Sequence, residues 1–161
     1  MTEVKEIQNM LCLALEAVYQ KDAYLIRNNN GTIDNHVSER GIVFRYGIYL
    51  DEVARTRFPL LNVDTEYNRN RNDLKRLPTR QRGSYPDLIL HERGTNNNNF
   101  LVIEFKTWWD SNQNDDKSKI EAFCDPLGEY RYKYGVLILF GKRRDESIVK
   151  LYSENNWEEM N

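Results

Sequence analysis

Two stretches of the sequence decide the fold: Tyr85-Pro86-Asp87-Leu88-Ile89-Leu90 and, further along, Asn99-Phe100-Leu101-Val102-Ile103-Glu104-Phe105-Lys106-Thr107. Both are rich in apolar and β-branched residues, and a loop rich in Gly, Thr and Asn separates them. This pattern predicts a β-hairpin with strands at 85–93 and 99–107. Because successive strand residues point to opposite faces, Glu104 and Lys106 share one face of the second strand.

The pairing of these two strands places three charged side chains together. A hairpin folded symmetrically about its loop sets Asp87 opposite Lys106 and Ile89 opposite Glu104. Directly opposed residues point to the same face, and diagonal neighbours lie ~7–8 Å apart. We therefore expect Asp87, Glu104 and Lys106 on one face. A slip of one residue would move Asp87 to the other face, so the prediction depends on the register.

Two acids and a lysine on an apolar sheet lose solvation on burial, which is costly unless they serve a purpose. A bound Mg²⁺ would offset that cost, because this ion favours one or two carboxylates together with waters and phosphate oxygens. Lys106 would then orient or deprotonate a metal-bound water. The alternative interpretations are a surface salt bridge between Glu104 and Lys106, and a turn residue after Pro86 for Asp87.

The rest of the chain predicts further helices and strands on both sides of the hairpin. Apolar residues at helical spacing predict an N-terminal helix at 3–20 and a second helix at 34–57, with Asp34 as its N-cap and Pro59 beyond its end. A short helix is expected at 117–123. Extended segments are predicted at 22–27, 60–68, 134–140 and 147–153, the last as an edge strand, and a long loop at 69–83.

Length and composition restrict the class of protein. The chain has 161 residues, the size of a single domain, and 30% of them are charged, which indicates a globular protein. No apolar run approaches the ~20 residues of a membrane span, and no secretion signal is visible, so we expect a cytoplasmic protein without a membrane. Cys12 and Cys124 are expected to be buried thiols, and the lack of ligand spacing around His36 and His91 argues against zinc.

The sequence resembles the PD-(D/E)xK nuclease superfamily, which has the restriction-endonuclease-like fold. The resemblance is carried by Pro86-Asp87, Glu104-x-Lys106 and the surrounding apolar strands, and it covers roughly residues 34–142. It implies a single α/β domain over residues 1–161, in which a mixed central sheet is flanked by helices in an αβββαβ core. Residues 1–30 would add an N-terminal helix and extension, and 147–153 an edge strand.

The resemblance also implies roles for individual residues. Asp87, Glu104 and the backbone carbonyl of Phe105 would bind Mg²⁺, for which Mn²⁺ is expected to substitute, and Lys106 would handle the attacking water. Glu39 matches an acid that many members carry on the first core helix, and it is a further catalytic and metal-ligand candidate. It could equally be a first-turn acid favoured by the helix dipole. The candidate accessory residues are Asp116, Lys119 and Trp108. The first two could equally form an exposed helix pair, and Trp108 could stack on a base or pack in the core or an interface.

A basic stretch precedes the Asp87 strand. It comprises Arg69, Arg71, Lys75, Arg76, Arg80 and Arg82 against the single acid Asp73. This is a local charge of +5 in a chain whose net charge is −2. We interpret the stretch as a loop that contacts phosphates, with a solvated loop as the alternative. The net acidity gives no wider basic surface for nucleic acid.

These observations together predict a metal-dependent nuclease, most simply a DNA endonuclease that hydrolyses phosphodiester bonds. A chain of this size has little surface for reading bases, so a homodimer or another partner is expected to help. One alternative is a nuclease-fold domain with weak or no catalysis that binds nucleic acid or a protein. A second is a protein-interaction domain without metal chemistry, whose acids merely lie on a polar sheet face.

Overall fold

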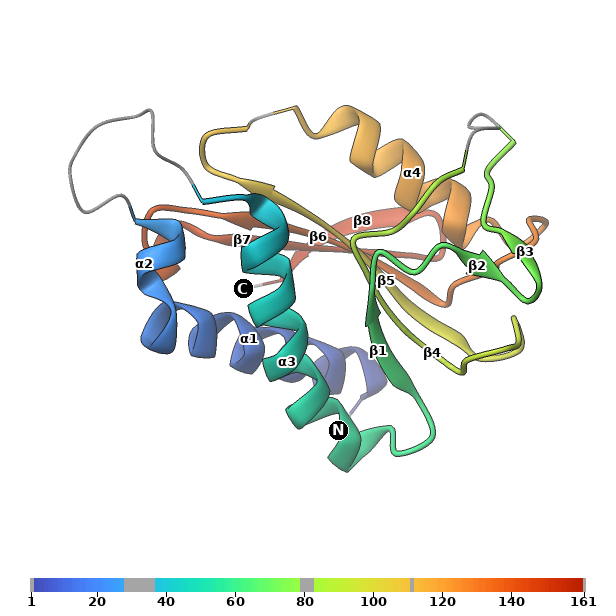
Figure 1. The fold of residues 1–161 in the computed structure, drawn as a ribbon, viewed down its shortest axis with the longest axis horizontal. Helices are drawn as coiled ribbons and strands as arrows, with labels where there is room; N and C mark the ends of the chain where they lie inside the picture. The colour runs from blue at the N-terminus through green and yellow to red at the C-terminus, as the bar shows by residue number, and fades with distance from the viewer. Residues whose placement is uncertain (1, 28–36, 79–82, 111, 161) are drawn as a thin grey trace.

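Strand β5 (Asn99–Thr107) lies at the centre of a six-stranded sheet in the computed structural model, which describes residues 2–27, 37–78, 83–110 and 112–160 (Figure 1). The strand order is β1-β4-β5-β6-β7-β8. Only β5 and β6 pair in parallel; the other neighbours are antiparallel, so the sheet is mixed as predicted. The other strands are β1 (Asn62–Thr65), β4 (Leu88–His91), β6 (Tyr134–Phe140), β7 (Ile148–Ser153) and β8 (Asn156–Met160).

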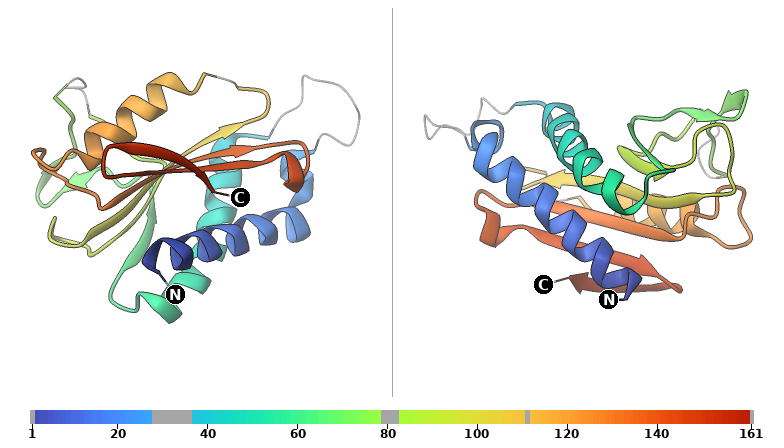
Figure 2. Two further views of the ribbon diagram at one scale, coloured as in Figure 1. Left: turned by 180° about the vertical axis from the view of Figure 1, so that it is seen from behind. Right: turned by 90° about the horizontal axis from the view of Figure 1, so that it is seen from below.

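Helices cover both faces of the sheet, as the sequence predicts (Figure 2). Helices α1 (Glu3–Lys21) and α3 (Glu39–Arg57) pack on one face, where Leu88, Ile103 and Phe105 belong to the larger apolar cluster. Helix α4 (Asn114–Cys124) packs on the other face, where Ile89 and Val102 join its own buried residues. The alternation along β4 and β5 thus supplies one apolar layer to each side.

The predicted register of the hairpin was wrong by two residues. Leu88 pairs with Ile103 and Ile89 with Val102, so Asp87 lies opposite Glu104 and not opposite Lys106. The pairing shifts between Leu90 and His91, so the two strands do not leave the loop symmetrically, as the prediction had assumed. Because a strand repeats every two residues, this slip leaves the three charged side chains on one face.

Several predicted elements differ from the observed ones. Residues 22–27 are not extended, because Ala23–Ile26 form the short helix α2. Strand β7 is not at the edge, because β8 pairs outside it. The predicted loop at 69–83 contains the small hairpin of β2 (Arg69–Asn70) and β3 (Asp73–Leu74). A 3-10 turn, η1 (Arg144–Glu146), precedes β7, and the predicted helix start at Asp34 lies outside the described residues.

The tight contact between α4 and the sheet depends on one glycine of β6. A Cβ atom at Gly135 would overlap Cγ2 of Ile120 and come within 3.1 Å of Sγ of Cys124. The helix that closes one face of the sheet can therefore approach β6 only where the strand has no side chain. No helix in the described ranges is long and apolar enough to cross a membrane.

We expect Gly135→Ala to lower the free energy of unfolding by about 1–3 kcal/mol, because the added methyl group must displace α4. Gly41→Ala is a matched control: that glycine lies within α3, and its Cβ would meet only Cγ1 of Val37 at 3.5 Å. It should raise the free energy of unfolding by roughly 0.5–1 kcal/mol, since alanine favours helix. Urea titrations of both variants measure the difference, and equal stability of the two would contradict this packing.

Candidate active site

Asp87 and Glu104 meet where β4 begins. The backbone N–H of Asp87 donates to Oε1 of Glu104 over 3.4 Å, and Oδ2 of Asp87 accepts from the backbone N–H of Phe105 over 2.9 Å. Glu104 lies within the sheet and is 1% exposed, whereas Asp87 is half-buried at its edge. The hairpin therefore brings the two predicted carboxylates side by side, and the pair opens to solvent through Asp87.

Glu104 is stabilised by a lysine from helix α4. Nζ of Lys119 donates to Oε2 of Glu104 over 2.8 Å, and both side chains are almost fully buried. Burial and the nearby charge of Asp87 raise the pKa of Glu104 well above its ordinary value, against the lowering effect of Lys119. A cation at this carboxylate would relieve both unfavourable effects. Lys119 is therefore part of the site and not an exposed helix residue.

Lys106 is held among carboxylates. Its Nζ lies 3.2 Å from Oδ2 of Asp116 and 3.4 Å from Oδ2 of Asp110. Burial by itself lowers the pKa of Lys106, but the surrounding acids, Asp116 foremost, more than offset it and raise the pKa above the ordinary value. This amine is thus an ammonium at neutral pH, which suits it to orienting a water or a phosphate oxygen rather than to accepting a proton.

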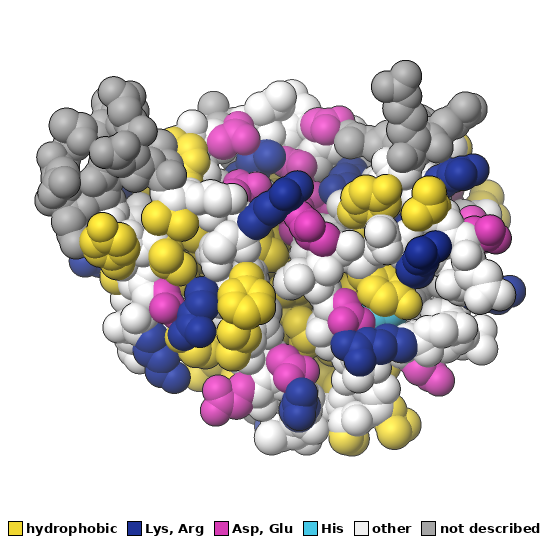
Figure 3. Space-filling view, viewed as in Figure 1, with side chains coloured by type: hydrophobic (Ala, Val, Ile, Leu, Met, Phe, Trp, Pro, Cys, Tyr) yellow, Lys and Arg dark blue, Asp and Glu magenta, His cyan; other side chains and the backbone are white. Residues whose placement is uncertain are grey.

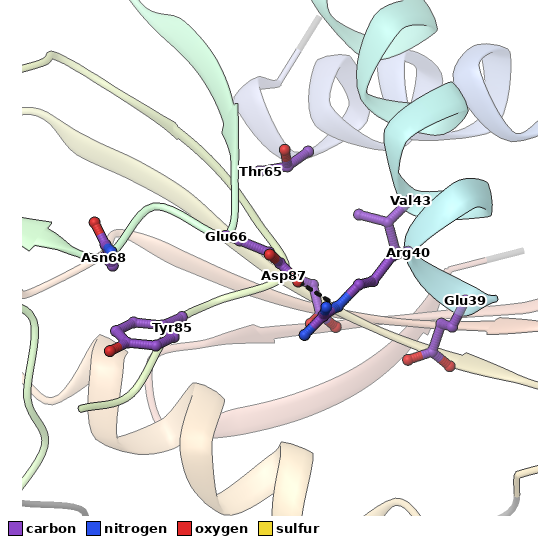
Figure 4. Close-up of a pocket in the computed structure, with 8 residues that line it drawn as sticks. All are labelled: Glu39, Arg40, Val43, Thr65, Glu66, Asn68, Tyr85 and Asp87. Carbon is purple, nitrogen blue, oxygen red and sulfur yellow. Dashed lines mark ion pairs between the residues drawn. The ribbon is translucent and has the colours of Figure 1, made fainter. Parts of the chain in front are cut away.

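Glu39 points from the start of α3 toward the same group of charges. Burial raises the pKa of Glu39 to about 7, Lys106 lowers it, and Asp87 raises it. Lys106 of β5 and Asp87, which precedes β4, affect the pKa of Glu39 because α3 begins near Asp87 (Figure 4). The alternative interpretation, a first-turn acid that interacts only with its helix dipole, does not account for this half-buried position.

A cavity of about 590 Å³ opens beside Asp87 (Figure 4). It lies between the start of α3, the end of β1 and the segment that leads into β4. The residues that line it are Glu39, Arg40, Val43, Thr65, Glu66, Asn68, Tyr85 and Asp87. Among the described residues, acidic and basic side chains intermingle over this side of the molecule (Figure 3). The cavity gives a ligand direct access to the exposed side of the carboxylate pair.

The donors at this site fit a hard cation such as Mg²⁺. The N–H and C=O of one strand residue point to the same side, so the carbonyl of Phe105 faces Asp87, as its N–H does. Within the described ranges, no group of three or more His, Cys, Asp or Glu side chains is arranged to hold a metal ion. The oxygen donors that a cation could reach here are those of Asp87, Glu104 and the Phe105 carbonyl, and Mg²⁺ commonly completes its coordination with water.

Part of the basic stretch differs from the prediction. Arg69, Arg71 and Arg76 are exposed, whereas Arg80 and Arg82 lie outside the described residues. Lys75 is 1% exposed, so its assignment to the phosphate-contacting set was wrong.

Lys75 is buried in a cage of aromatic rings. Its Nζ donates to the hydroxyl of Tyr132 over 2.9 Å and lies 5.1–5.7 Å from four ring centroids. These rings belong to Tyr67, Phe123, Tyr130 and Tyr132. Burial lowers the pKa of Lys75 to about 8, and the rings favour the ammonium through cation–π attraction. This lysine anchors the basic stretch and does not bind a ligand at the surface.

Trp108 packs within the fold. Its indole Nε1 donates to the carbonyl oxygen of Ile26 over 3.2 Å, its ring meets that of Trp109 edge-on, and Nζ of Lys142 lies 4.5 Å from its centroid. These contacts account for Trp108 without a base stacked on it.

The sequence did not identify Tyr85, Arg40, Glu66 or Asn68 as site residues, because three separate segments form the cavity. The local signal for Tyr85 was its position beside Pro86-Asp87.

No protein-family model matches the chain, and no curated protein resembles it significantly in sequence. The interpretation of the site therefore depends on its own geometry and charges.

Glu39 gives the site a pH-dependent stability that can be measured. Its pKa is about 7 in the folded chain, above the ~4.3 of an unfolded glutamate. The folded state therefore binds this proton more tightly, and the resulting stability is complete below about pH 4 and lost as the pH rises through 7. In EDTA at pH 8 we expect Glu39→Gln to raise the free energy of unfolding by on the order of 1 kcal/mol, since the carboxyl is partly exposed.

The same change should have little effect near pH 4, where Glu39 is protonated. Glu52→Gln, at an exposed position of α3, is the matched control and should leave the pH dependence unchanged. Denaturant titrations at several pH values provide the comparison. Parallel pH profiles for the wild type and Glu39→Gln would contradict the proposed environment of this carboxyl group.

Proposed function

We propose that this chain is a metal-dependent nuclease that hydrolyses phosphodiester bonds in nucleic acid, most simply DNA. The observation that carries the proposal is the buried carboxylate of Glu104 beside Asp87, with Lys106 two residues further along the same face of β5. Five acids and two lysines gather here, so carboxylates outnumber ammonium groups, and a bound cation would offset their mutual repulsion. The acids are Glu39, Asp87, Glu104, Asp110 and Asp116, and the lysines are Lys106 and Lys119.

Each residue of the site has a role that follows from its geometry. Asp87, Glu104 and the Phe105 carbonyl would hold Mg²⁺ or Mn²⁺. When bound, the ion supplies charge for the phosphate oxygens and acidifies a coordinated water. Lys106, as an ammonium restrained by Asp116, donates a hydrogen bond that positions the attacking water or a phosphate oxygen. Lys119 keeps the Glu104 carboxylate oriented, and the half-buried Glu39 can accept a proton near neutral pH.

The basic stretch connects the site to the nucleic-acid backbone. Asn68 lines the cavity, and exposed Arg69 follows it directly. Two backbone hydrogen bonds close the segment: Lys75 donates to Asn68 over 2.8 Å, and Ser84 donates to Lys75 over 3.0 Å. The segment therefore leaves the cavity wall and returns to it at Tyr85. The side-chain amide of Asn70 bonds Glu129 and Asn96, which lies in the loop between β4 and β5, so Arg69 and Arg71 lie toward that loop. They would contact the nucleic-acid backbone away from the scissile phosphate.

We expect the purified protein to cleave DNA with Mg²⁺ or Mn²⁺ and not with EDTA. Asp87→Asn, Glu104→Gln and Lys106→Ala should each lower the rate by about 100-fold or more, because each removes charge stabilisation of the transition state. The measurement is cleavage of a labelled oligonucleotide by protein free of contaminating nuclease. Lys5→Ala, at an exposed position of α1, is the control and should retain the wild-type rate.

Full cleavage by Lys106→Ala would contradict this mechanism. A titration with Mn²⁺ separates the function classes even where cleavage is slow. Binding at one or two sites, lost in Asp87→Asn, is expected for the nuclease, whereas a protein-interaction domain would bind no metal.

The exposed arginines of the basic stretch should set the salt dependence of binding. Each phosphate contact on duplex DNA contributes about −0.9 to the slope of log K against log salt. Replacing Arg69, Arg71 and Arg76 together by Gln should therefore flatten the slope by ~2–3 units and weaken binding strongly at low salt. Fluorescence anisotropy of a labelled duplex in EDTA, across a series of salt concentrations, measures this slope.

The matched control for that triple variant removes the same charge elsewhere. Arg55, Arg57 and Arg143 lie at the end of α3 and before η1, and their joint replacement by Gln should leave the slope nearly unchanged. An equal change of slope in both triple variants would show that net charge, and not the basic stretch, governs binding.

A further inference from the structure

The cavity beside Asp87 contains an aromatic ring that is fixed in place. Tyr85 is 41% exposed and lines the cavity, and it is followed directly by the Pro86-Asp87 segment (Figure 4). A Cβ atom at Gly83, which has φ of +105°, would lie 2.8 Å from the Tyr85 hydroxyl and 3.0 Å from Cζ. The backbone of Gly83 therefore rests against the ring. An exposed ring held by backbone offers a flat apolar surface at little cost in conformational entropy.

Other residues that line the cavity offer hydrogen-bonding groups. Thr65, Glu66 and Asn68 contribute a hydroxyl, a carboxylate and an amide. Glu66 has φ of +47°, an unfavourable conformation for a residue with a side chain, and its N–H donates to the carbonyl of Asp87 over 3.0 Å. The turn that carries these groups is thus bonded directly to the backbone of the candidate metal ligand. Backbone strain of this kind is often retained at sites where it positions a functional group.

The charges of the cavity restrict what it can hold. Glu39, Glu66 and Asp87 place three carboxylates on its wall, against the single cation Arg40. No lysine is among these lining residues. Arg40 is already paired with Glu66 over 2.7 Å, and its side chain is 82% exposed. A second phosphate would be repelled here. A neutral, planar group that donates hydrogen bonds to carboxylates, and that stacks on an aromatic ring, suits the cavity.

We propose that this cavity binds one unpaired nucleobase next to the scissile phosphate. The proposal rests on the proposed nuclease function, and it adds that the substrate is single-stranded, or opened, at that nucleotide. Tyr85 stacks on the base, and Glu66 and Asn68 contact its edge, which favours bases with an exocyclic amino group. A base inside a Watson–Crick pair cannot present that edge, so it must leave the duplex to enter. The volume of about 590 Å³ lies within the range of small-molecule sites.

Equilibrium binding in EDTA tests this base site without any need for cleavage. The probes are fluorescent single-stranded DNA oligonucleotides with an abasic position placed in turn along the strand, and a fully paired duplex of the same sequence. For the wild type we expect the abasic nucleotide to weaken binding by about 5- to 20-fold at one position and little elsewhere. The single strand should bind more tightly than the duplex.

Variants assign the effect to the ring. Tyr85→Ala should weaken single-strand binding by about 5- to 20-fold and remove the abasic effect, whereas Tyr85→Phe should retain both. Tyr24→Ala, at a 69% exposed tyrosine of α2, is the matched control and should behave as the wild type. Gly83→Ala, which pushes on the ring, should weaken binding as Tyr85→Ala does. Circular dichroism confirms that each variant is folded.

The outcomes separate this proposal from the nuclease function. If Tyr85→Ala binds as the wild type, or if no abasic position matters, the base site is wrong, whether or not metal-dependent cleavage is observed. If the Tyr85-dependent abasic effect appears but Mn²⁺ binding and cleavage do not, the base site stands and the nuclease function fails. If the wild type binds no oligonucleotide at low salt, both proposals are overturned.

Discussion

The buried carboxylate of Glu104 is the constraint on which the site depends. It lies on the central strand of the sheet at 1% exposure, where an isolated charge would be very costly. Its position requires a partner from another element, and Lys119 of α4 supplies it across 2.8 Å. The packing of α4 against the sheet, made possible by Gly135, therefore also determines the electrostatics of the site. The contact between α4 and the sheet thus both closes one face of the fold and supplies the partner of Glu104.

The two faces of strand β5 have different functions because a strand alternates its side chains. Ile103 and Phe105 pack into the apolar core beneath α1 and α3. Glu104 and Lys106 point to the side of α4, where the sheet ends in charged groups instead of a continuous apolar surface. The rigid apolar face keeps the backbone fixed, so the charged face can hold its carboxylates close together despite their repulsion.

The basic stretch near the site is anchored to the rest of the fold. In the described part of this stretch, aromatic rings enclose the buried ammonium of Lys75, and backbone hydrogen bonds join Lys75 to Asn68 and to Ser84. The exposed arginines are thus presented from an ordered support. The exposed arginines of this stretch and the carboxylates of the cavity thus lie on different parts of the chain.

The sequence by itself determined the hairpin, the strand at 134–140, the N-terminal helix and the mixed α/β class, because local apolar patterns indicate each of these elements. It also placed Asp87 and Glu104 on one face. Side chains alternate between the two faces of a strand, so an error of two residues in the register leaves each of them on the predicted face. Only the tertiary structure decided that Lys119 reaches Glu104, that Lys75 is buried, and that β8 covers β7. Those outcomes depend on contacts between segments far apart in the chain, for which local sequence carries no periodic signal.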